Sequence, residues 1–138
     1  MIAMIMDGQG GGIGSAIIKG IREKISEDLD IWALGTNSIA TSRMMKAGAN
    51  RGATGENAIL YTSPKVDFII GPLAIIMPNA MMGEVTPGMA EAVSSSAAKK
   101  ILIPLTQERV EIVGIASEPL PHLVDQVVEI LKEMYKNV

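Results

Sequence analysis

The stretch MIAMIMDGQGGGIGSAIIK, residues Met1–Lys19, decides the fold of this chain. Its first six residues, Met1–Met6, form the short continuous apolar run that is typical of a strand buried on both faces. After a cluster of glycines, isoleucines recur at helical spacing at Ile13, Ile17, Ile21 and Ile25. Glycine permits both the sharp turn and the close approach of a ligand. The stretch therefore predicts a strand, a phosphate-binding loop and a helix that ends near Glu27–Asp28.

The loop itself supplies the main candidate binding groups. Unpaired N–H groups at a helix start, together with the helix dipole, favour an anion such as phosphate. The fingerprint G-x-G-x-x-G is not met, because Ile13 stands where the third glycine should be, and no Lys-Ser or Lys-Thr completes a P-loop. The looser spacing of Gly8, Gly12 and Gly14 is similar to the cofactor loop of short-chain dehydrogenases. We expect ligand contacts from Gly8, Gln9, Gly10, Gly11, Gly12, Ile13 and Gly14; the alternative is a tight turn without a ligand.

Composition limits the class of protein. A chain of 138 residues is long enough for one domain, residues 1–138, and its residues are 48% hydrophobic but only 3% aromatic. Such a core suits a parallel sheet covered by helices. The net charge of −3 and scattered basic residues argue against nucleic acid or an acidic membrane surface as partners. With no cysteine and one histidine, we expect neither disulfides nor a bound metal.

Two further expectations follow from hydropathy. The chain opens on a strand without a basic leader, and the apolar run Phe68–Met82 contains two prolines and is too short to cross a bilayer. We therefore predict a cytoplasmic protein. The mean hydropathy of +0.30 is high for a small domain and predicts a homo-oligomer that buries apolar surface between subunits. The methionines Met77, Met81, Met82 and Met89 favour such an interface over a ligand box.

The second strand, predicted over Ile31–Leu34, ends in a polar stretch. Dinucleotide folds place an acidic residue at this strand end to hold the ribose, but Leu34 or Gly35 stands there, which argues against ordinary NAD binding. Instead, a phosphate or polar headgroup can be held by Thr36, Asn37, Ser38 and Arg43. Alternatively, Asn37 or Ser38 only caps the following helix, predicted over Ile39–Ala47.

A polar segment with two glycines, residues 50–57, is predicted to be a loop that borders the site. Arg51 is its candidate phosphate clamp, and Glu56 is a candidate partner for a hydroxyl or a metal. Polarity for solubility alone is the other interpretation. Thr54 is expected to cap a short helix over Gly55–Thr62.

The remaining elements complete the predicted sheet. The third strand, Val66–Ile70, ends in Gly71, another candidate at a carboxyl edge, and Leu73–Met77 is predicted to be irregular or briefly helical. Thr86 should cap a helix over Pro87–Ala97. The fourth and fifth strands are predicted over Lys100–Pro104 and Val110–Ile115, and the last helix over Pro119–Lys136. Only five residues separate the two strands, so they should pair as an antiparallel hairpin at the edge of the sheet.

Four segments together resemble a family of short bacterial proteins of unknown function: DGQGGGIG, GTNSIATSRMMKAGANRGATGENAI, GPLAIIMPNAMMGEVTPGMAEA and EPLPHLVDQ. The resemblance covers most of the chain. It implies a Rossmann-like, nucleotide-binding fold, but no reaction and no catalytic residues.

We therefore predict a three-layer α/β/α Rossmann-like sandwich, with a mostly parallel sheet of about five strands and an antiparallel edge hairpin. Ligands of such sheets lie beyond the carboxyl ends of the strands, where Asp7–Gly14, Gly35–Ser38, Gly71 and Thr106 should gather. The predicted function is the binding of a phosphate-bearing small molecule, a nucleotide or dinucleotide such as NADP. The alternatives are a small enzyme, an NADP-dependent oxidoreductase or an enzyme of a phospho-ligand, with Asp7 or Glu84 as acid or base, and a scaffold subunit without catalysis.

Overall fold

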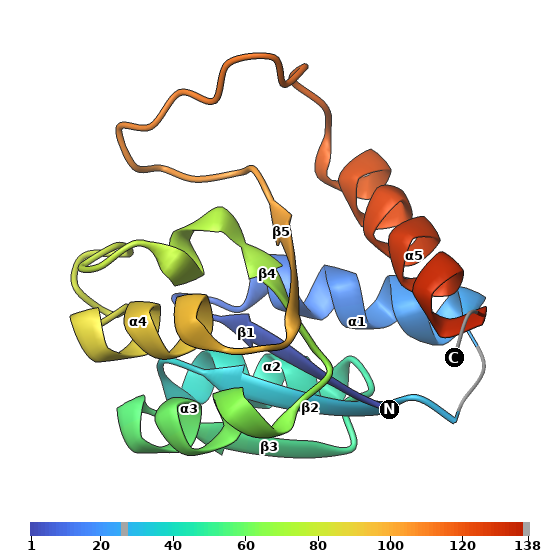
Figure 1. Cartoon of the computed structure of the whole chain (residues 1–138), viewed down its shortest axis with the longest axis horizontal. Coiled ribbons are helices and arrows are strands. Elements are labelled where there is room, and N and C mark those ends of the chain that lie inside the picture. The colour runs from blue at the N-terminus through green and yellow to red at the C-terminus, as the bar shows by residue number, and fades with distance from the viewer. Residues whose placement is uncertain (26–27, 137–138) are drawn as a thin grey trace.

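The computed structural model describes residues 1–25 and 28–136 and is built around one parallel sheet. Its five strands lie in the spatial order β3-β2-β1-β4-β5, and every neighbouring pair is parallel (Figure 1). The strands are β1 (Ile2–Asp7), β2 (Asp30–Gly35), β3 (Arg51–Thr54), β4 (Phe68–Pro72) and β5 (Lys99–Ile103). β1 is thus central, as the apolar run Met1–Met6 predicts.

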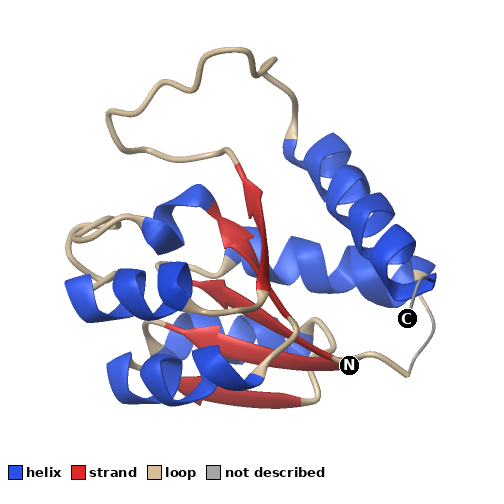
Figure 2. Cartoon of the chain, in the orientation of Figure 1, coloured by secondary structure: helices blue, strands red, loops and turns tan. Residues whose placement is uncertain are grey.

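Helices cover both faces of the sheet, as Figure 2 shows. One face carries α1 (Gly12–Lys24), α2 (Ser38–Lys46) and α5 (Leu120–Lys136). The other carries α3 (Glu56–Thr62), α4 (Pro87–Ser95) and two 3₁₀ helices, η1 (Ser63–Lys65) and η2 (Leu73–Ile76). The predicted three-layer sandwich is confirmed.

The strand β1 explains why its run is apolar without interruption. Ala3 and Ile5 point into the core shared with α1, α2 and α5, whereas Met4 and Met6 point into the core on the opposite face. All four side chains are fully buried. A strand with two buried faces cannot alternate apolar and polar residues, so the continuous run follows from its central position.

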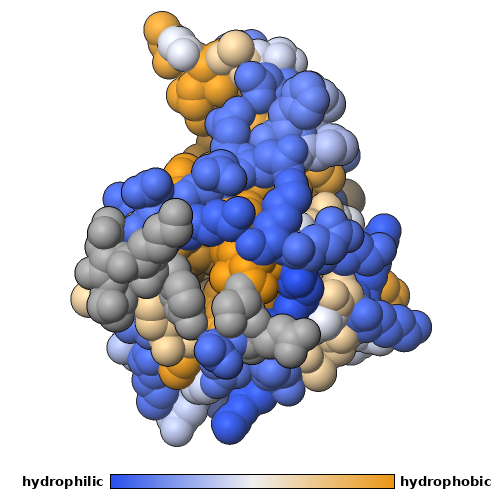
Figure 3. All heavy atoms as spheres, turned by 90° about the vertical axis from the view of Figure 1, so that its right-hand side faces the viewer, coloured by the Kyte–Doolittle hydropathy of each residue, from blue (hydrophilic) through white to orange (hydrophobic). Residues whose placement is uncertain are grey.

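The predicted antiparallel hairpin is wrong. β5 pairs parallel to β4, and α4 provides the crossover between them. Residues Val110–Ile115 form no strand; they belong to a segment that leads away from the end of β5 and returns to α5 (Figure 1). Apolar side chains lie on its surface, with Val113 98% exposed and Ile115 51% exposed, and Figure 3 shows hydrophobic residues at its outer end.

The polar segment 50–57 also differs from its prediction as a loop. Residues 51–54 form β3, an edge strand whose four residues are all exposed. A short edge strand has little face to bury, so polar residues are compatible with it. Thr54 does not cap α3, because its hydroxyl pairs with Thr41 and Gly55 holds the cap position.

Two predicted helix caps are confirmed. The Asn37 side chain accepts the Ala40 N–H at the start of α2, and the Thr86 hydroxyl accepts the Met89 N–H at the start of α4. α1 ends at Lys24, earlier than the predicted end near Glu27–Asp28, and Glu27 lies outside the described residues. In the described part of the chain, no helix is long and apolar enough to cross a membrane.

Candidate functional site

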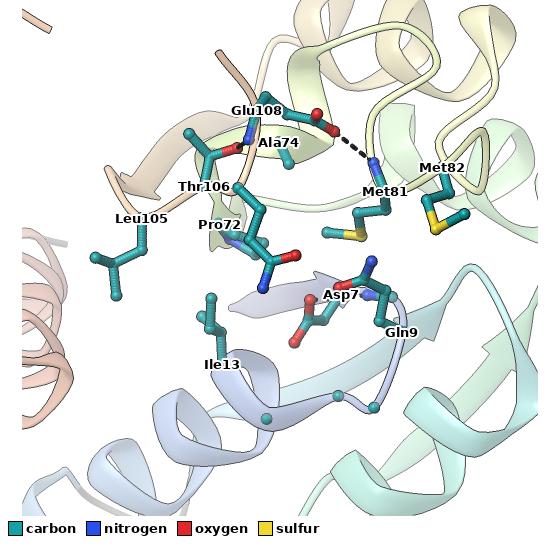
Figure 4. Close-up of a pocket in the computed structure, with 15 residues that line it drawn as sticks. Asp7, Gln9, Ile13, Pro72, Ala74, Met81, Met82, Leu105, Thr106 and Glu108 are labelled. Atoms are coloured by element: carbon teal, nitrogen blue, oxygen red, sulfur yellow. Dashed lines mark hydrogen bonds between the residues drawn. The ribbon is translucent and has the colours of Figure 1, made fainter. Parts of the chain in front are cut away.

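The candidate site lies where the connections from two adjacent strands diverge. β1 leads into α1 on one face of the sheet, and β4 leads into η2 on the other. In open parallel sheets, ligands bind in the crevice outside the carboxyl ends at such a point. A cleft of about 510 Å³ opens there (Figure 4), lined by Asp7, Gly8, Gln9, Gly10, Gly11, Gly12, Ile13, Pro72, Ala74, Met81, Met82, Leu105, Thr106, Gln107 and Glu108.

Asp7 closes the glycine-rich loop from inside. Its Oδ1 accepts the Gly8 N–H at 2.8 Å and its Oδ2 accepts the Gly14 N–H at 2.7 Å. The side chain is 3% exposed. Burial raises the pKa of Asp7 above its ordinary value, although the hydrogen bonds from the loop amides partly offset that rise. Asp7 therefore fixes the loop and presents a carboxyl group that favours its neutral form more than an exposed one does.

The tip of the loop keeps two amides free. Gly11 is left-handed, with φ of +72°, and a Cβ there would lie 2.9 Å from Cα of Ala40, so only glycine fits. Within the described part of the chain, the N–H groups of Gly10 and Gly12 donate no hydrogen bond. Arg43 of α2 lies beside them, because its Nη1 donates to the Gly10 carbonyl at 3.2 Å.

Glu84 occupies the other side of the loop, toward β2. Its Oε1 accepts three hydrogen bonds, from the Gln9 N–H at 2.8 Å, the Thr36 hydroxyl at 2.7 Å and the Asn37 amide at 2.8 Å. Desolvation raises the pKa of Glu84, but these three hydrogen bonds outweigh it and the pKa lies below its ordinary value. Glu84 is therefore a carboxylate at neutral pH.

The wall opposite the loop comes from residues after β5 and from the segment before α4. Glu108 Oε1 accepts the Met81 N–H at 2.7 Å, and the Glu108 N–H donates to the Thr106 hydroxyl at 3.0 Å. In Figure 4, Leu105 and Ile13 lie toward one end of the cleft, Met81 and Met82 toward the other, and Asp7 between them. The cleft thus combines apolar ends with polar groups at its centre.

The structure does not bring every predicted residue to this cleft. Arg51 lies at the amino end of β3, opposite Trp32, with its guanidinium 5.4 Å from the centre of the indole ring. Ser38 is exposed at the start of α2. A Cβ on Gly71 would lie 2.3 Å from the Met6 carbonyl oxygen, so Gly71 is needed for strand packing. Glu56 accepts the Thr86 hydroxyl and ties α3 to α4.

Sequence reasoning missed Gln107 and Glu108 as wall residues, although Thr106 was expected at this edge. They follow the carboxyl end of β5, and that position alone could have placed them at the site. The prediction placed these residues in the turn of an edge hairpin and therefore did not assign them to the site. Among residues 1–25 and 28–136, no three His, Asp or Glu side chains gather closely enough to hold a metal ion.

A comparison with solved structures supports the fold. One solved structure, described as a dodecameric FMN-dependent Ubix-like decarboxylase from Escherichia coli O157:H7, is similar with a TM-score of 0.53 and 15% identity. The match covers 99% of this chain and 94% of that one. At this identity the likeness shows a shared fold.

No curated protein matches this chain. The model of one family, the domain of unknown function DUF3842, matches residues 2–136, which is nearly the whole chain. The chain therefore belongs to the DUF3842 family.

Proposed function

We propose that this protein binds a mononucleotide of the flavin type, with the phosphate at the tip of the glycine-rich loop and the ring system in the cleft. The observation that carries this proposal is the open cleft of about 510 Å³ beside the free amides of Gly10 and Gly12. The volume lies within the range of roughly 300–1,000 Å³ that small-molecule sites occupy.

The phosphate end follows from the chemistry of the loop tip. Among the residues that the structure describes, the Gly10 and Gly12 N–H groups have no acceptor, and α1 begins at Gly12 with no acidic residue in its first turn, so the helix dipole favours an anion. Arg43 supplies a positive charge beside these amides, since its Nη1 lies 3.7 Å from the place that a Cβ on either glycine would take. A guanidinium with free N–H groups can pair with phosphate oxygens.

The ring end follows from the walls of the cleft. Ile13 and Leu105 provide apolar surface, and the Met81 and Met82 thioethers can contact a planar heterocycle. The Thr106 hydroxyl and the Gln107 amide offer hydrogen bonds to ring heteroatoms. This combination of apolar walls with few polar groups is typical of cofactor sites.

Two observations favour FMN over the NADP expected from the sequence. Glu84 already occupies Thr36 and Asn37 on the β2 side, where a dinucleotide would place its second half. The similar solved structure is described as FMN-dependent. A mononucleotide needs only the side of the loop that is open.

A homo-oligomer remains part of the proposal. Val110, Val113 and Ile115 are exposed apolar residues on one extended segment, and the similar structure is described as a dodecamer. Sedimentation equilibrium would test it, since a purely monomeric species at micromolar concentration would contradict this part of the proposal.

Paired titrations with FMN and riboflavin test the binding proposal, because the two differ only in the phosphate. At a hundred times its dissociation constant, FMN should raise the free energy of unfolding by about 2.7 kcal/mol. Riboflavin should bind at least tenfold more weakly. Equal affinity for both would contradict the phosphate site, and no stabilisation by either would favour a scaffold subunit.

A further inference from the structure

Three hydrogen-bond donors converge on one oxygen atom beside the cleft. The Gln9 N–H, the Thr36 hydroxyl and the Asn37 side-chain amide all point at Oε1 of Glu84, at 2.7–2.8 Å. We call Gln9, Thr36 and Asn37 the donor triad. Two strands supply it, since Gln9 follows β1 and the other two residues follow β2.

Glu84 reaches the donor triad from elsewhere in the chain, from the segment between η2 and α4. In the described residues it forms no salt bridge, so neutral donors alone balance its charge. Hydrogen bonds to an ionised acceptor are roughly twice as strong as those between neutral groups, and backbone and side-chain dipoles of this kind bind free anions in many proteins. The donor triad therefore has the chemistry of an anion site whose occupant is part of the protein.

The position of the donor triad indicates which kind of anion it could bind. It lies at the carboxyl ends of β1 and β2, where dinucleotide folds hold the second half of their ligand. Gly8 separates it from the cleft: a Cβ on Gly8 would meet Oγ1 of Thr36, Sδ of Met81 and Oε1 of Glu84, all within 3 Å. The donor triad and the open cleft are thus neighbouring compartments of one binding edge.

We propose that the donor triad is an anion site for a second phosphate, that Glu84 fills it from within, and that Glu84 thereby selects mononucleotides over dinucleotides. The selectivity rests on the proposed function, whereas the anion site does not. A diphosphate ligand that reached the donor triad would have to displace Glu84 or lie against its charge, and both cost free energy.

The segment that carries Glu84 is held from both sides. Asn79, Met81 and Met82 have φ values of +66°, +56° and +57°, which are uncommon for residues other than glycine. Glu84 binds the segment to the donor triad, and the Glu108 carboxylate accepts the Met81 N–H within the wall opposite the loop. Because the segment is attached on the far side as well, truncating Glu84 should empty the donor triad without releasing Met81 from the cleft.

The test uses Glu84→Ala, with Glu91→Ala as the matched control. Glu91 is exposed on α4, and its substitution changes the net charge by the same amount. Pyrophosphate binding is measured by isothermal titration for both variants and the wild type. Glu84→Ala should bind pyrophosphate at least tenfold more tightly than either, and the ratio of FMN to FAD affinity should fall at least tenfold in this variant alone.

Glu84→Gln tests whether Glu84 excludes anions by occupying the donor triad or by its negative charge. Its amide oxygen can still accept hydrogen bonds from the donor triad, so pyrophosphate affinity should stay near the wild-type value. A gain in Glu84→Gln equal to that in Glu84→Ala would overturn the filling role. If Glu84→Ala does not fold, Glu84→Ser, which retains one acceptor, replaces it.

Folded Glu84→Ala or Glu84→Ser with no more pyrophosphate affinity than Glu91→Ala would overturn the anion site. This outcome is distinct from failure of the proposed function. A protein that never binds FMN, yet gains pyrophosphate binding when Glu84 is truncated, would keep the anion site and lose only the flavin proposal.

Discussion

The two sides of β1 use the same edge of the sheet in different ways. On the β2 side, Glu84 occupies the side-chain donors of Thr36 and Asn37, and the edge is closed. On the β4 side, a cleft of about 510 Å³ remains open. The flanking strands end alike, β2 in Gly35 and β4 in Gly71-Pro72. The difference therefore comes from segments distant in sequence, which fill one side and only border the other.

The two carboxylates of this edge show the same contrast on a smaller scale. Asp7 and Glu84 both accept backbone N–H groups from the glycine-rich loop. Burial dominates at Asp7 and raises its pKa, whereas at Glu84 the hydrogen bonds outweigh desolvation and lower the pKa. Similar donors thus produce opposite shifts, because water reaches one group and not the other.

The largest effect on stability should come from disturbing the contact between β1 and β4. In Gly71→Ala, the new Cβ would lie 2.3 Å from the Met6 carbonyl oxygen, so β1 and β4 must separate. We expect the free energy of unfolding to fall by about 3 kcal/mol. Urea denaturation followed by circular dichroism measures it. Gly12→Ala, where a Cβ has room, is the control; equal stability of the two variants would mean that the strand contact is not tight.

Asp7→Asn tests how the loop is closed. The amide keeps one acceptor oxygen but sets its NH₂ group against a backbone N–H, so a buried donor is left unpaired. The free energy of unfolding should fall by about 1–3 kcal/mol.

The same variant tests the raised pKa of Asp7. A carboxyl group with a raised pKa stabilises the fold at low pH and loses that contribution as pH rises through the raised pKa. The stability of the wild type relative to Asp7→Asn should therefore fall as pH rises above the ordinary value of 3.8. A difference that grows instead over that range would contradict the raised pKa.

Gly12→Asp tests the phosphate end of the open side. A side chain fits there, since the nearest atom to its Cβ is Nη1 of Arg43 at 3.7 Å, but its charge would repel a phosphate. FMN affinity should fall at least tenfold, about 1.4 kcal/mol, in a folded protein. Gly12→Ala should bind almost as the wild type does. Unchanged affinity in the aspartate variant would place the phosphate elsewhere.

Glu84→Gln should have the smallest effect, which is a change in how the free energy of unfolding depends on pH. A carboxylate with a lowered pKa stabilises the fold above its ordinary value of 4.5 and loses that contribution as pH falls through the lowered pKa. The wild type should therefore lose stability relative to Glu84→Gln as pH falls through this window. Urea midpoints measured across it are the test, and parallel pH profiles would contradict the lowered pKa.

Much of the fold was predictable because its signals are local. The apolar run Met1–Met6 and the helical period of the following isoleucines were enough to predict β1 and α1, and the Thr86-Pro87 pair marked the start of α4. The failures lie where local signals are ambiguous. Val110–Ile115 is apolar enough for a strand, yet no strand edge accepts it, and β3 is too polar to suggest a strand.

The candidate site was predictable only in part. Glycines after a strand indicate a loop at the carboxyl edge, and Thr36 and Asn37 were correctly placed near it. Their actual partner, Glu84, lies far along the chain, and no local pattern reports such a pairing. Arg51 was expected at the site because it is a lone cation in a polar stretch, but the register of β3 pairs it with Trp32 in the middle of β2, away from the carboxyl edge.

The packing of α5 on α1 has a consequence for the order of folding during synthesis. α5 covers the side of α1 that the sheet leaves open with Leu123, Val124, Val127, Val128 and Leu131, and Lys24 of α1 pairs with Asp125. A nascent chain translated only as far as β5 has all five strands but leaves that side of α1 exposed. Before α5 emerges from the ribosome, such an intermediate would be a natural substrate for a chaperone that recognises apolar surface.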